Sequence, residues 1–298
     1  MTSTIRDRST FHAGSKTGVL LLHGLTGTPT ELRYISNGLS RAGFTVSVPQ
    51  LAGHCGTLED LKATRWQDWY QSAEDALLEL RRTCDFVIVG GLSMGAVLAL
   101  KLAAEHPESV DGATAFAPTF RFDGWCIPWY ARLFDLVHDT WTADKFLFTE
   151  REPYGIKNVR FREFVMNALQ SDDTAEIGLV GTPGRSLVQF RYLAKSVQRV
   201  LGLIRQPVLV LHPREDDRAS LSNAELLQRK LGGRVSTVVL EDCYHVITLD
   251  QQRDVVLDET RDFVTKLEQA AIAAKTIETR VAPARKSATP KSNPLRPR

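Results

Sequence analysis

The chain has 298 residues, of which 43% are hydrophobic and 24% charged, a composition typical of a globular protein with a substantial core. The formal net charge is only +2, no segment approaches the roughly eighteen uncharged apolar residues of a membrane helix, and the N-terminus lacks the apolar stretch of a secretion signal. We therefore expect a cytoplasmic protein with no membrane span and no specific nucleic-acid partner, and four widely spaced cysteines without a Cys-x-x-Cys pair argue against a disulfide framework or a zinc knuckle.

The first predicted strand follows a polar lead over residues 1–16. Residues 17–22 form an apolar run that enters a glycine-rich turn, HGLTGTP, and a helix is predicted over residues 30–42. Such a turn can direct backbone N–H groups toward the end of a neighbouring strand, as an oxyanion hole requires. His23 opens this turn and is expected to order the backbone rather than to transfer protons.

The rest of the chain is organised around a strand that ends at a serine. Residues 85–90 are short, apolar and β-branched, whereas residues 94–104 are rich in Ala and Leu, so a buried strand and a helix are predicted. The sequence GLSMG lies on the turn between them. A tight turn of this kind needs small neighbours and leaves the hydroxyl exposed beside a helix N-terminus, where negative charge is stabilised. Ser93 is therefore the candidate nucleophile.

Strands and helices alternate as far as residue 117. Further elements are predicted around the serine unit: a strand over 44–48, the loop PQLAGHCG, a helix over 66–82 and a strand over 110–117. His54, in that loop, is expected to order it. The alternation predicts an α/β fold with a doubly wound, mostly parallel sheet.

The alternation stops over residues 118–203, where we expect a helical cap above the carboxyl ends of the strands. Helices are predicted within it near residues 127–138, 159–170 and 186–203. Its many aromatic residues either form the small core of the cap or line an apolar substrate pocket. Trp125, Trp129 and Trp141 are the candidates for the pocket wall.

After the cap the alternation resumes, so the predicted core comprises residues 17–117 and 204–270. Its remaining elements are strands over 207–212 and 235–240 and helices over 219–231 and 253–268. Residues 271–298 contain seven Lys or Arg, one acid, four prolines and no aromatic residue, which predicts a disordered basic tail of net charge +6. Contact with nucleic acid or an anionic membrane is one use for such a tail, but we expect it to be solvated without a specific partner.

A serine hydroxyl becomes nucleophilic when an imidazole accepts its proton and a carboxylate orients that imidazole. Loops after different strands of a parallel sheet converge on one edge, so the loops after the last two predicted strands both reach Ser93. His245 follows the last strand and is the predicted base. Glu215, Asp216 and Asp217 are adjacent candidates for the acid, and the register of their loop favours Asp216.

Five segments of this chain, HGLTGTP, LAGHCG, GLSMG, HPREDD and YHVITLD, resemble the motif series of the α/β-hydrolase superfamily. The resemblance covers about residues 17–268 and is strongest to bacterial carboxylesterases and monoacylglycerol lipases, which have a very similar histidine segment. It implies that Ser93 is the nucleophile, Asp216 the acid and His245 the base, which is also the chain order of that fold.

The same resemblance implies that the backbone N–H groups of Leu25 and Met94 form the oxyanion hole. Two features depart from the family pattern. Cys55 replaces the usual glycine of the Gly-His-Gly loop, and the cap is longer than in the small esterases. Because cap residues decide the substrate in this family, the motifs indicate the reaction better than the substrate.

We therefore predict a serine hydrolase that cleaves carboxylic esters with an apolar acyl group, without a metal ion or an organic cofactor. Related hydrolases of halides and epoxides need an aspartate nucleophile, so the serine at position 93 argues against them. An acyl thioesterase is the alternative enzyme, with acyl-coenzyme A as a substrate or an acyl carrier protein as a partner. A non-catalytic ligand receptor is the alternative from another class. The oligomeric state is left open.

Overall fold

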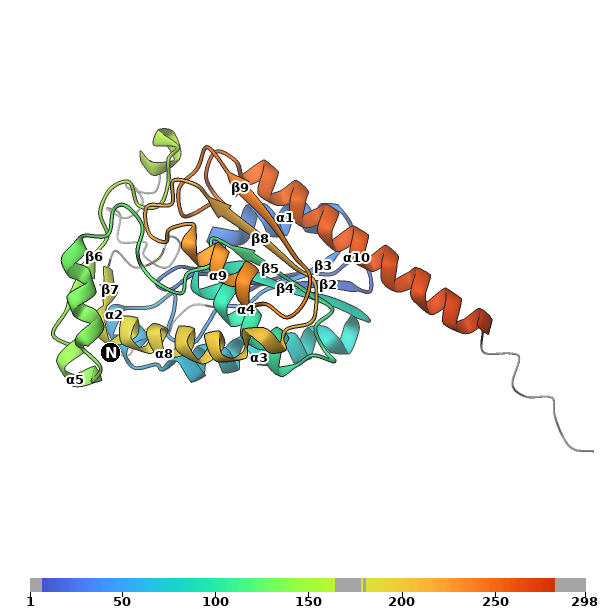
Figure 1. The fold of residues 1–298 in the computed structure, drawn as a ribbon, viewed down its shortest axis with the longest axis horizontal. Coiled ribbons are helices and arrows are strands. Elements are labelled where there is room, and N and C mark those ends of the chain that lie inside the picture. The colour runs from blue at the N-terminus through green and yellow to red at the C-terminus, as the bar shows by residue number, and fades with distance from the viewer. Residues whose placement is uncertain (1–6, 164–177, 179–180, 282–298) are drawn as a thin grey trace, which may run out of the picture.

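A seven-stranded sheet crosses the computed structural model, which describes residues 7–163, 178 and 181–281 (Figure 1). The strand order is β1-β3-β2-β4-β5-β8-β9, and neighbouring strands are parallel except for the antiparallel pair of β1 and β3. The strands are β1 Thr10–His12, β2 Thr17–Leu22, β3 Thr45–Val48, β4 Phe86–Leu92, β5 Gly112–Phe116, β8 Val208–Pro213 and β9 Val235–Leu240. The predicted α/β fold with a mostly parallel sheet is confirmed.

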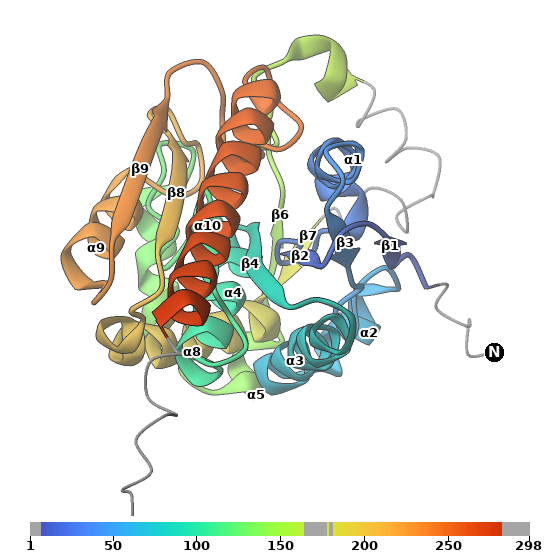
Figure 2. The same ribbon diagram turned by 90° about the vertical axis from the view of Figure 1, so that its right-hand side faces the viewer.

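Helices cover both faces of the sheet, which gives three layers (Figure 2). Helices α1 (Arg33–Arg41) and α10 (Arg253–Val281) pack on one face. Helices α3 (Trp66–Thr83), α4 (Met94–Glu105), α8 (Gly184–Val200) and α9 (Ser222–Lys230) pack on the other. The shorter helices are η1 Pro29–Leu32, α2 Leu58–Lys62 and η3 Leu201–Leu203.

The apolar pattern of each element explains its place in these layers. Strand β2 is buried at every position, and β4 at every position after the first, because both faces of the central sheet are covered. Helix α4 is buried over nearly its whole length, because the sheet lies on one side of it and α3 and α8 on the other. Helix α3 buries a single stripe that includes Trp69, Ala73 and Leu77 and leaves its polar face in water.

The cap contains a strand pair as well as helices. Strand β6 (Leu147–Thr149) pairs antiparallel with β7 (Gly181–Pro183), beside η2 (Trp129–Leu136) and α5 (Thr140–Ala143) (Figure 1). Phe134 packs against Phe146 and Phe148, with ring centroids 5.4 and 4.8 Å away. These rings are the small core of the cap. Part of the helix predicted near residues 159–170 lies outside the described residues.

Three predicted segment boundaries need correction. The polar lead contains β1, a three-residue edge strand that is too short to give a periodic signal. Helix α8 was assigned to the cap, but its buried residues Phe190, Leu193 and Val197 pack on α4 and α3, so it belongs to the core layer. Helix α10 continues through the Ala-rich start of the predicted tail to Val281 and projects beyond the sheet (Figure 1), while residues 282–298 lie outside the described chain. Within the described ranges, no helix combines the length and apolar character needed to cross a bilayer.

Candidate active site

Ser93 lies at the turn between β4 and α4 in a backbone conformation that residues other than glycine rarely adopt, with φ 57° and ψ −111°. The two flanking glycines are required by close packing. A Cβ atom at Gly95 would lie 2.0 Å from the carbonyl oxygen of Leu22, and one at Gly91 would lie 2.5 Å from the same oxygen. The strained turn therefore fixes the Ser93 side chain at the end of β4, on the wall of a pocket.

His245 and Asp216 meet at the same end of the sheet, although 29 positions separate them in the chain. The Nδ1 atom of His245 lies 2.9 Å from Oδ2 and 3.1 Å from Oδ1 of Asp216, and both residues are buried. Burial alone would raise the pKa of Asp216, but the charge and hydrogen bond of His245 hold that pKa below its ordinary value. Asp216 is thus an ionised acceptor that orients the imidazole with Nδ1 as the donor.

Among the three adjacent acids, Asp216 is the one that contacts the imidazole ring. Glu215 points outward and forms an ion pair with Lys157 at 2.9 Å. Asp217 accepts backbone N–H groups instead, from His245 at 3.2 Å and from Gly155 of the cap at 3.0 Å. These placements support the register predicted for the acid.

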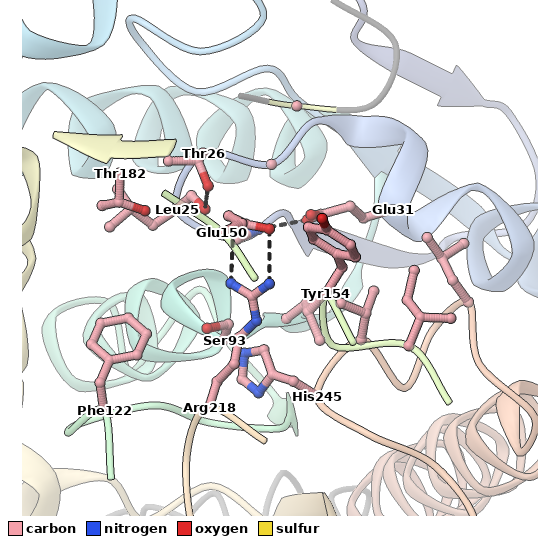
Figure 3. Close-up of a pocket in the computed structure, with 17 residues that line it drawn as sticks. Leu25, Thr26, Glu31, Ser93, Phe122, Glu150, Tyr154, Thr182, Arg218 and His245 are labelled. Atoms are coloured by element: carbon pink, nitrogen blue, oxygen red, sulfur yellow. Dashed lines mark hydrogen bonds and ion pairs between the residues drawn. The ribbon is translucent and has the colours of Figure 1, made fainter. Parts of the chain in front are cut away.

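The Ser93 hydroxyl donates a hydrogen bond to Thr119 Oγ1 at 3.1 Å. Thr119 is fully buried and in turn donates to the carbonyl oxygen of Ala117 at 3.1 Å. Among the described residues, no hydrogen bond joins Ser93 to His245, although both side chains line the same pocket (Figure 3). Transfer of the Ser93 proton to His245 therefore needs a rotation of the hydroxyl away from Thr119.

The two predicted oxyanion donors come from two different turns. Met94 is the first residue of α4, and Leu25 lies in the glycine-rich turn after β2, on the pocket wall. Within the part of the chain that the structure describes, neither backbone N–H donates to another protein group. The turn is closed by a hydrogen bond from the Gly27 N–H to the Gly24 carbonyl at 3.2 Å, and Thr26 adopts a φ of 66°. Both amides are thus free to receive a substrate oxygen.

A family model described as "Alpha/beta hydrolase family" matches residues 19–259. This chain belongs to the alpha/beta hydrolase family. It is 28% identical over 250 residues to a thermostable monoacylglycerol lipase of Bacillus sp. (strain H-257), with 84% of this chain and 90% of that protein covered. It is 26% identical over 264 residues to a carboxylesterase of Bacillus subtilis (strain 168), with 87% and 96% covered.

Solved structures agree with this family. A structure of metagenome-derived lipolytic enzymes matches with a TM-score of 0.72 and 27% identity, covering 87% of this chain and 97% of the other. A monoglyceride lipase of Saccharomyces cerevisiae matches with a TM-score of 0.72 over 89% and 95% of the two chains, and its 15% identity shows a shared fold. The predicted resemblance and fold are confirmed.

The pocket of this alpha/beta hydrolase is lined by both apolar and charged side chains (Figure 3). Its volume is about 120 Å³. Apolar residues of the wall are Leu25, Leu92, Phe122, Ile156, Val246 and Leu249, and the polar ones include Thr26, Glu31, Glu150, Thr182 and Arg218. Across the described ranges, no cluster of three or more His, Cys, Asp or Glu side chains is arranged to hold a metal ion.

The assignment of three tryptophans to the pocket wall is wrong. Trp125, Trp129 and Trp141 are 59%, 78% and 74% exposed, and they do not line the pocket. Trp125 donates from its indole N–H to the Glu215 carbonyl, and its ring packs against Tyr244 outside the pocket. Aromatic side chains are usually at least partly buried, but the sequence does not show which face of an irregular cap lies toward Ser93. Two other aromatic side chains of the predicted cap, Phe122 and Tyr154, do line the pocket.

An ion pair inside the pocket was not predicted from the sequence. Arg218 donates from both Nη atoms to the two carboxylate oxygens of Glu150, each at 2.8 Å (Figure 3). The pair joins the loop after β8 to the cap segment after β6. Arg218 could have been noticed as the neighbour of the predicted acid, whereas Glu150 lies in a polar stretch with no pattern that marks it.

His23 and His54 order the loops behind the active site, as expected. His23 Nε2 accepts the Leu51 N–H at 3.2 Å, and its ring centroid lies 4.8 Å from that of His54. Both rings are buried. Burial lowers the pKa of His54 to about 4, and burial together with His54 lowers the pKa of His23 well below its ordinary value. Both imidazoles are therefore neutral in the folded protein.

Mild acid should destabilise the fold through these neutral histidines. Because the folded pKa of His54 is about 4 and its ordinary value is 6.5, the unfolded chain binds a proton first as the pH falls. The His54 contribution is thus present above pH 6.5 and is lost progressively down to pH 4, by about 2 kcal/mol between pH 7 and pH 5. Urea unfolding of the wild type and of His54→Gln at both pH values measures this loss.

The His54→Gln variant should show a smaller decrease between the two pH values than the wild type. His138→Gln, at an exposed position of the cap, is the matched control and should retain the full decrease. Equal decreases in all three proteins would show that His54 is not held neutral by the fold.

Proposed function

We propose that this alpha/beta hydrolase cleaves carboxylic esters through an acyl-enzyme on Ser93. The observation that supports this function most is that His245 shares a pocket with Ser93, which lies on a strained strand-to-helix turn, and is hydrogen-bonded to the ionised Asp216. The similarity to proteins named as a monoacylglycerol lipase and a carboxylesterase agrees with it. The cytoplasmic location of the enzyme remains a prediction.

In the proposed acylation step, the Ser93 oxygen attacks the ester carbonyl carbon while His245 Nε2 accepts the hydroxyl proton. The carbonyl π electrons move to the oxygen, and this oxyanion accepts hydrogen bonds from the Leu25 and Met94 N–H groups. Asp216 stabilises the imidazolium that forms and stays ionised throughout. Collapse of the intermediate expels the alcohol, which takes the proton from His245.

Deacylation repeats the sequence with water as the nucleophile. His245 accepts a proton from water as its oxygen bonds to the acyl carbon, and the same two amides hold the second oxyanion. Breakage of the bond to Ser93 releases the carboxylic acid, and the proton on His245 restores the serine hydroxyl.

The size of the pocket suggests a short acyl group. A cavity of about 120 Å³ is available beside Ser93. An apolar cavity of about 150 Å³ holds a benzene molecule, so this one suits a chain of about four to six carbons. Each methylene buried in the transition state can raise catalytic efficiency by up to about fourfold, until the cavity is filled.

A panel of p-nitrophenyl esters from acetyl to decanoyl, beside the matching coenzyme A thioesters, tests this function. We expect catalytic efficiency to rise to an optimum near four to six carbons and then to fall, with esters preferred over thioesters. Absence of hydrolysis for every ester would refute the proposal. A clear preference for the thioesters would favour the acyl thioesterase, and acyl carrier proteins would then be tested as partners.

Phe122→Ala should move this optimum toward longer chains, because it removes an aromatic ring from the pocket wall and enlarges the pocket. Trp129→Ala removes a cap aromatic that does not reach the pocket, and it should leave the profile unchanged. If Trp129→Ala changed the optimal chain length and Phe122→Ala did not, the acyl group would bind elsewhere on the cap.

A further inference from the structure

We propose that Glu31 is a positioning residue of the oxyanion hole, which it supports by holding the turn that carries the Leu25 amide. The inference rests on the proposed ester hydrolysis and adds a residue to that site. Glu31 lies in η1, one turn after the glycine-rich segment, and its side chain reaches back into the pocket (Figure 3). It is half-buried there, within the wall rather than on the outer surface.

The first contact is a hydrogen bond to the backbone next to the proposed donor. The Gly24 N–H donates to Glu31 Oε2 at 3.0 Å. The next peptide along the chain carries the Leu25 N–H, so a rotation of the Gly24 segment would displace the proposed oxyanion donor. A hydrogen bond to a carboxylate is stronger than one to a neutral acceptor, and it restrains that rotation.

The second contact is the packing of the carboxyl group on Gly27. A Cβ atom at Gly27 would lie 2.3 Å from each carboxyl oxygen of Glu31, so the side chain fills the space that a larger residue would need. The Glu31 carboxyl group therefore contacts the turn at both ends, at Gly24 and at Gly27. Leu25 and Thr26 lie between these two points.

Titratable or charged groups from three other segments face Glu31. They are Glu150 of the cap, Arg218 of the loop after β8 and His245 of the loop after β9, with the Tyr154 hydroxyl in the same pocket. Burial is the main cause that raises the pKa of Glu31 to about 7, and the charge of Glu150 adds to it, while the Gly24 N–H, His245 and Arg218 oppose it. The carboxyl group thus changes charge in the pH range where the enzyme would work.

The charge of the Glu31 carboxyl group should affect the rate of the reaction. Below pH 7 the neutral acid still accepts the Gly24 N–H through its carbonyl oxygen, so the turn stays in place. Above pH 7 the carboxylate holds the turn but places a negative charge near the oxyanion, which opposes the charge that forms on the substrate. The Glu31 ionisation should therefore lower the rate as the pH rises.

The test compares wild type, Glu31→Gln and Glu31→Leu in ester hydrolysis from pH 5.5 to 9, with active sites counted by stoichiometric fluorophosphonate labelling. Glutamine keeps an acceptor oxygen without the charge, so its kcat should match the wild type at pH 6 and exceed it by about fivefold at pH 9. Leucine keeps no acceptor, so its kcat should be about tenfold or more below the wild type at every pH, with KM changed little.

Glu59→Gln, at an exposed glutamate paired with Lys62, is the matched control and should follow the wild-type profile. His245 is present in all four proteins, and Glu59→Gln keeps the Glu31 charge beside it, so the difference between wild type and Glu31→Gln measures the whole effect of the Glu31 charge, on the oxyanion and on the neighbouring His245. Parallel profiles for these two, or equal kcat for Glu31→Leu and wild type, would overturn the proposal. An inactive wild type would instead refute the ester hydrolase function itself.

Discussion

Replacement of Ser93 by alanine is expected to lower ester turnover by about a millionfold and to abolish fluorophosphonate labelling. The reason is that the acyl-enzyme cannot form without the Ser93 oxygen, whereas His245, Asp216 and the two amides alone give only weak catalysis. The change removes one buried oxygen atom that is bonded to Thr119, so the fold should survive it. Peptide mapping of the labelled wild-type protein, beside the steady-state rates of the variant, measures both effects.

Ser196→Ala is a suitable control, because the Ser196 hydroxyl bonds to the Leu193 carbonyl within α8 and does not line the pocket. It should be labelled and active like the wild type. A label on another serine, or hydrolysis that survives Ser93→Ala, would remove the acyl-enzyme mechanism. A folded wild type with neither labelling nor turnover would favour a ligand receptor built on a hydrolase fold.

Asp216→Asn should lower turnover by about ten-thousandfold. The wild-type carboxylate accepts the His245 Nδ1–H and leaves Nε2 free to take the serine proton. An asparagine amide in that place can present an N–H group, which would favour the other tautomer and give Nε2 the proton it should accept. Single-turnover acylation rates, with unfolding followed in parallel, distinguish this loss from a loss of folded protein.

The neighbouring acids supply matched comparisons for Asp216. Asp217→Asn keeps one oxygen that can accept the His245 or the Gly155 N–H, and it should cost less than about tenfold. Glu215→Gln loses a partly exposed ion pair with Lys157 and should change little. If Asp217→Asn instead caused the ten-thousandfold loss of turnover, Asp217 rather than Asp216 would be the acid.

Much of the fold could be predicted because its central strands are buried on both faces and therefore appear in the sequence as apolar runs, whereas the edge strand β9 is only partly buried. The runs at 17–22 and 235–240 match β2 and β9 at both ends. Ser93 could be identified because the strained turn needs glycines at fixed positions, and those positions are visible in the sequence. The structure places Ser93, Asp216 and His245 as the order of strands and loops predicts.

The sequence was less informative where a contact depends on packing between distant segments. Helix α8 has the same amphipathic pattern as a cap helix would have, and only its contacts with α3 and α4 assign it to the core. The tryptophans of the cap gave a strong aromatic signal but turn outward. Glu31 and Glu150 reach the pocket from a 3₁₀ turn and from an irregular segment, and neither has a periodic pattern that indicates its direction.

Three consecutive residues after β8 connect this loop to two other parts of the molecule, the loop after β9 and the cap. Asp216 binds the His245 ring, Asp217 joins the His245 and Gly155 amides, and Arg218 forms the double hydrogen bond with Glu150. The cap is consequently not an interchangeable module. A chimera that grafts the cap of another hydrolase onto this core would leave the Arg218 charge without its partner, beside Asp216. Such a graft needs Glu150 and Gly155 carried over with it, or Asp217 and Arg218 redesigned together, so that neither the Asp217 carboxylate nor the Arg218 charge loses its partner.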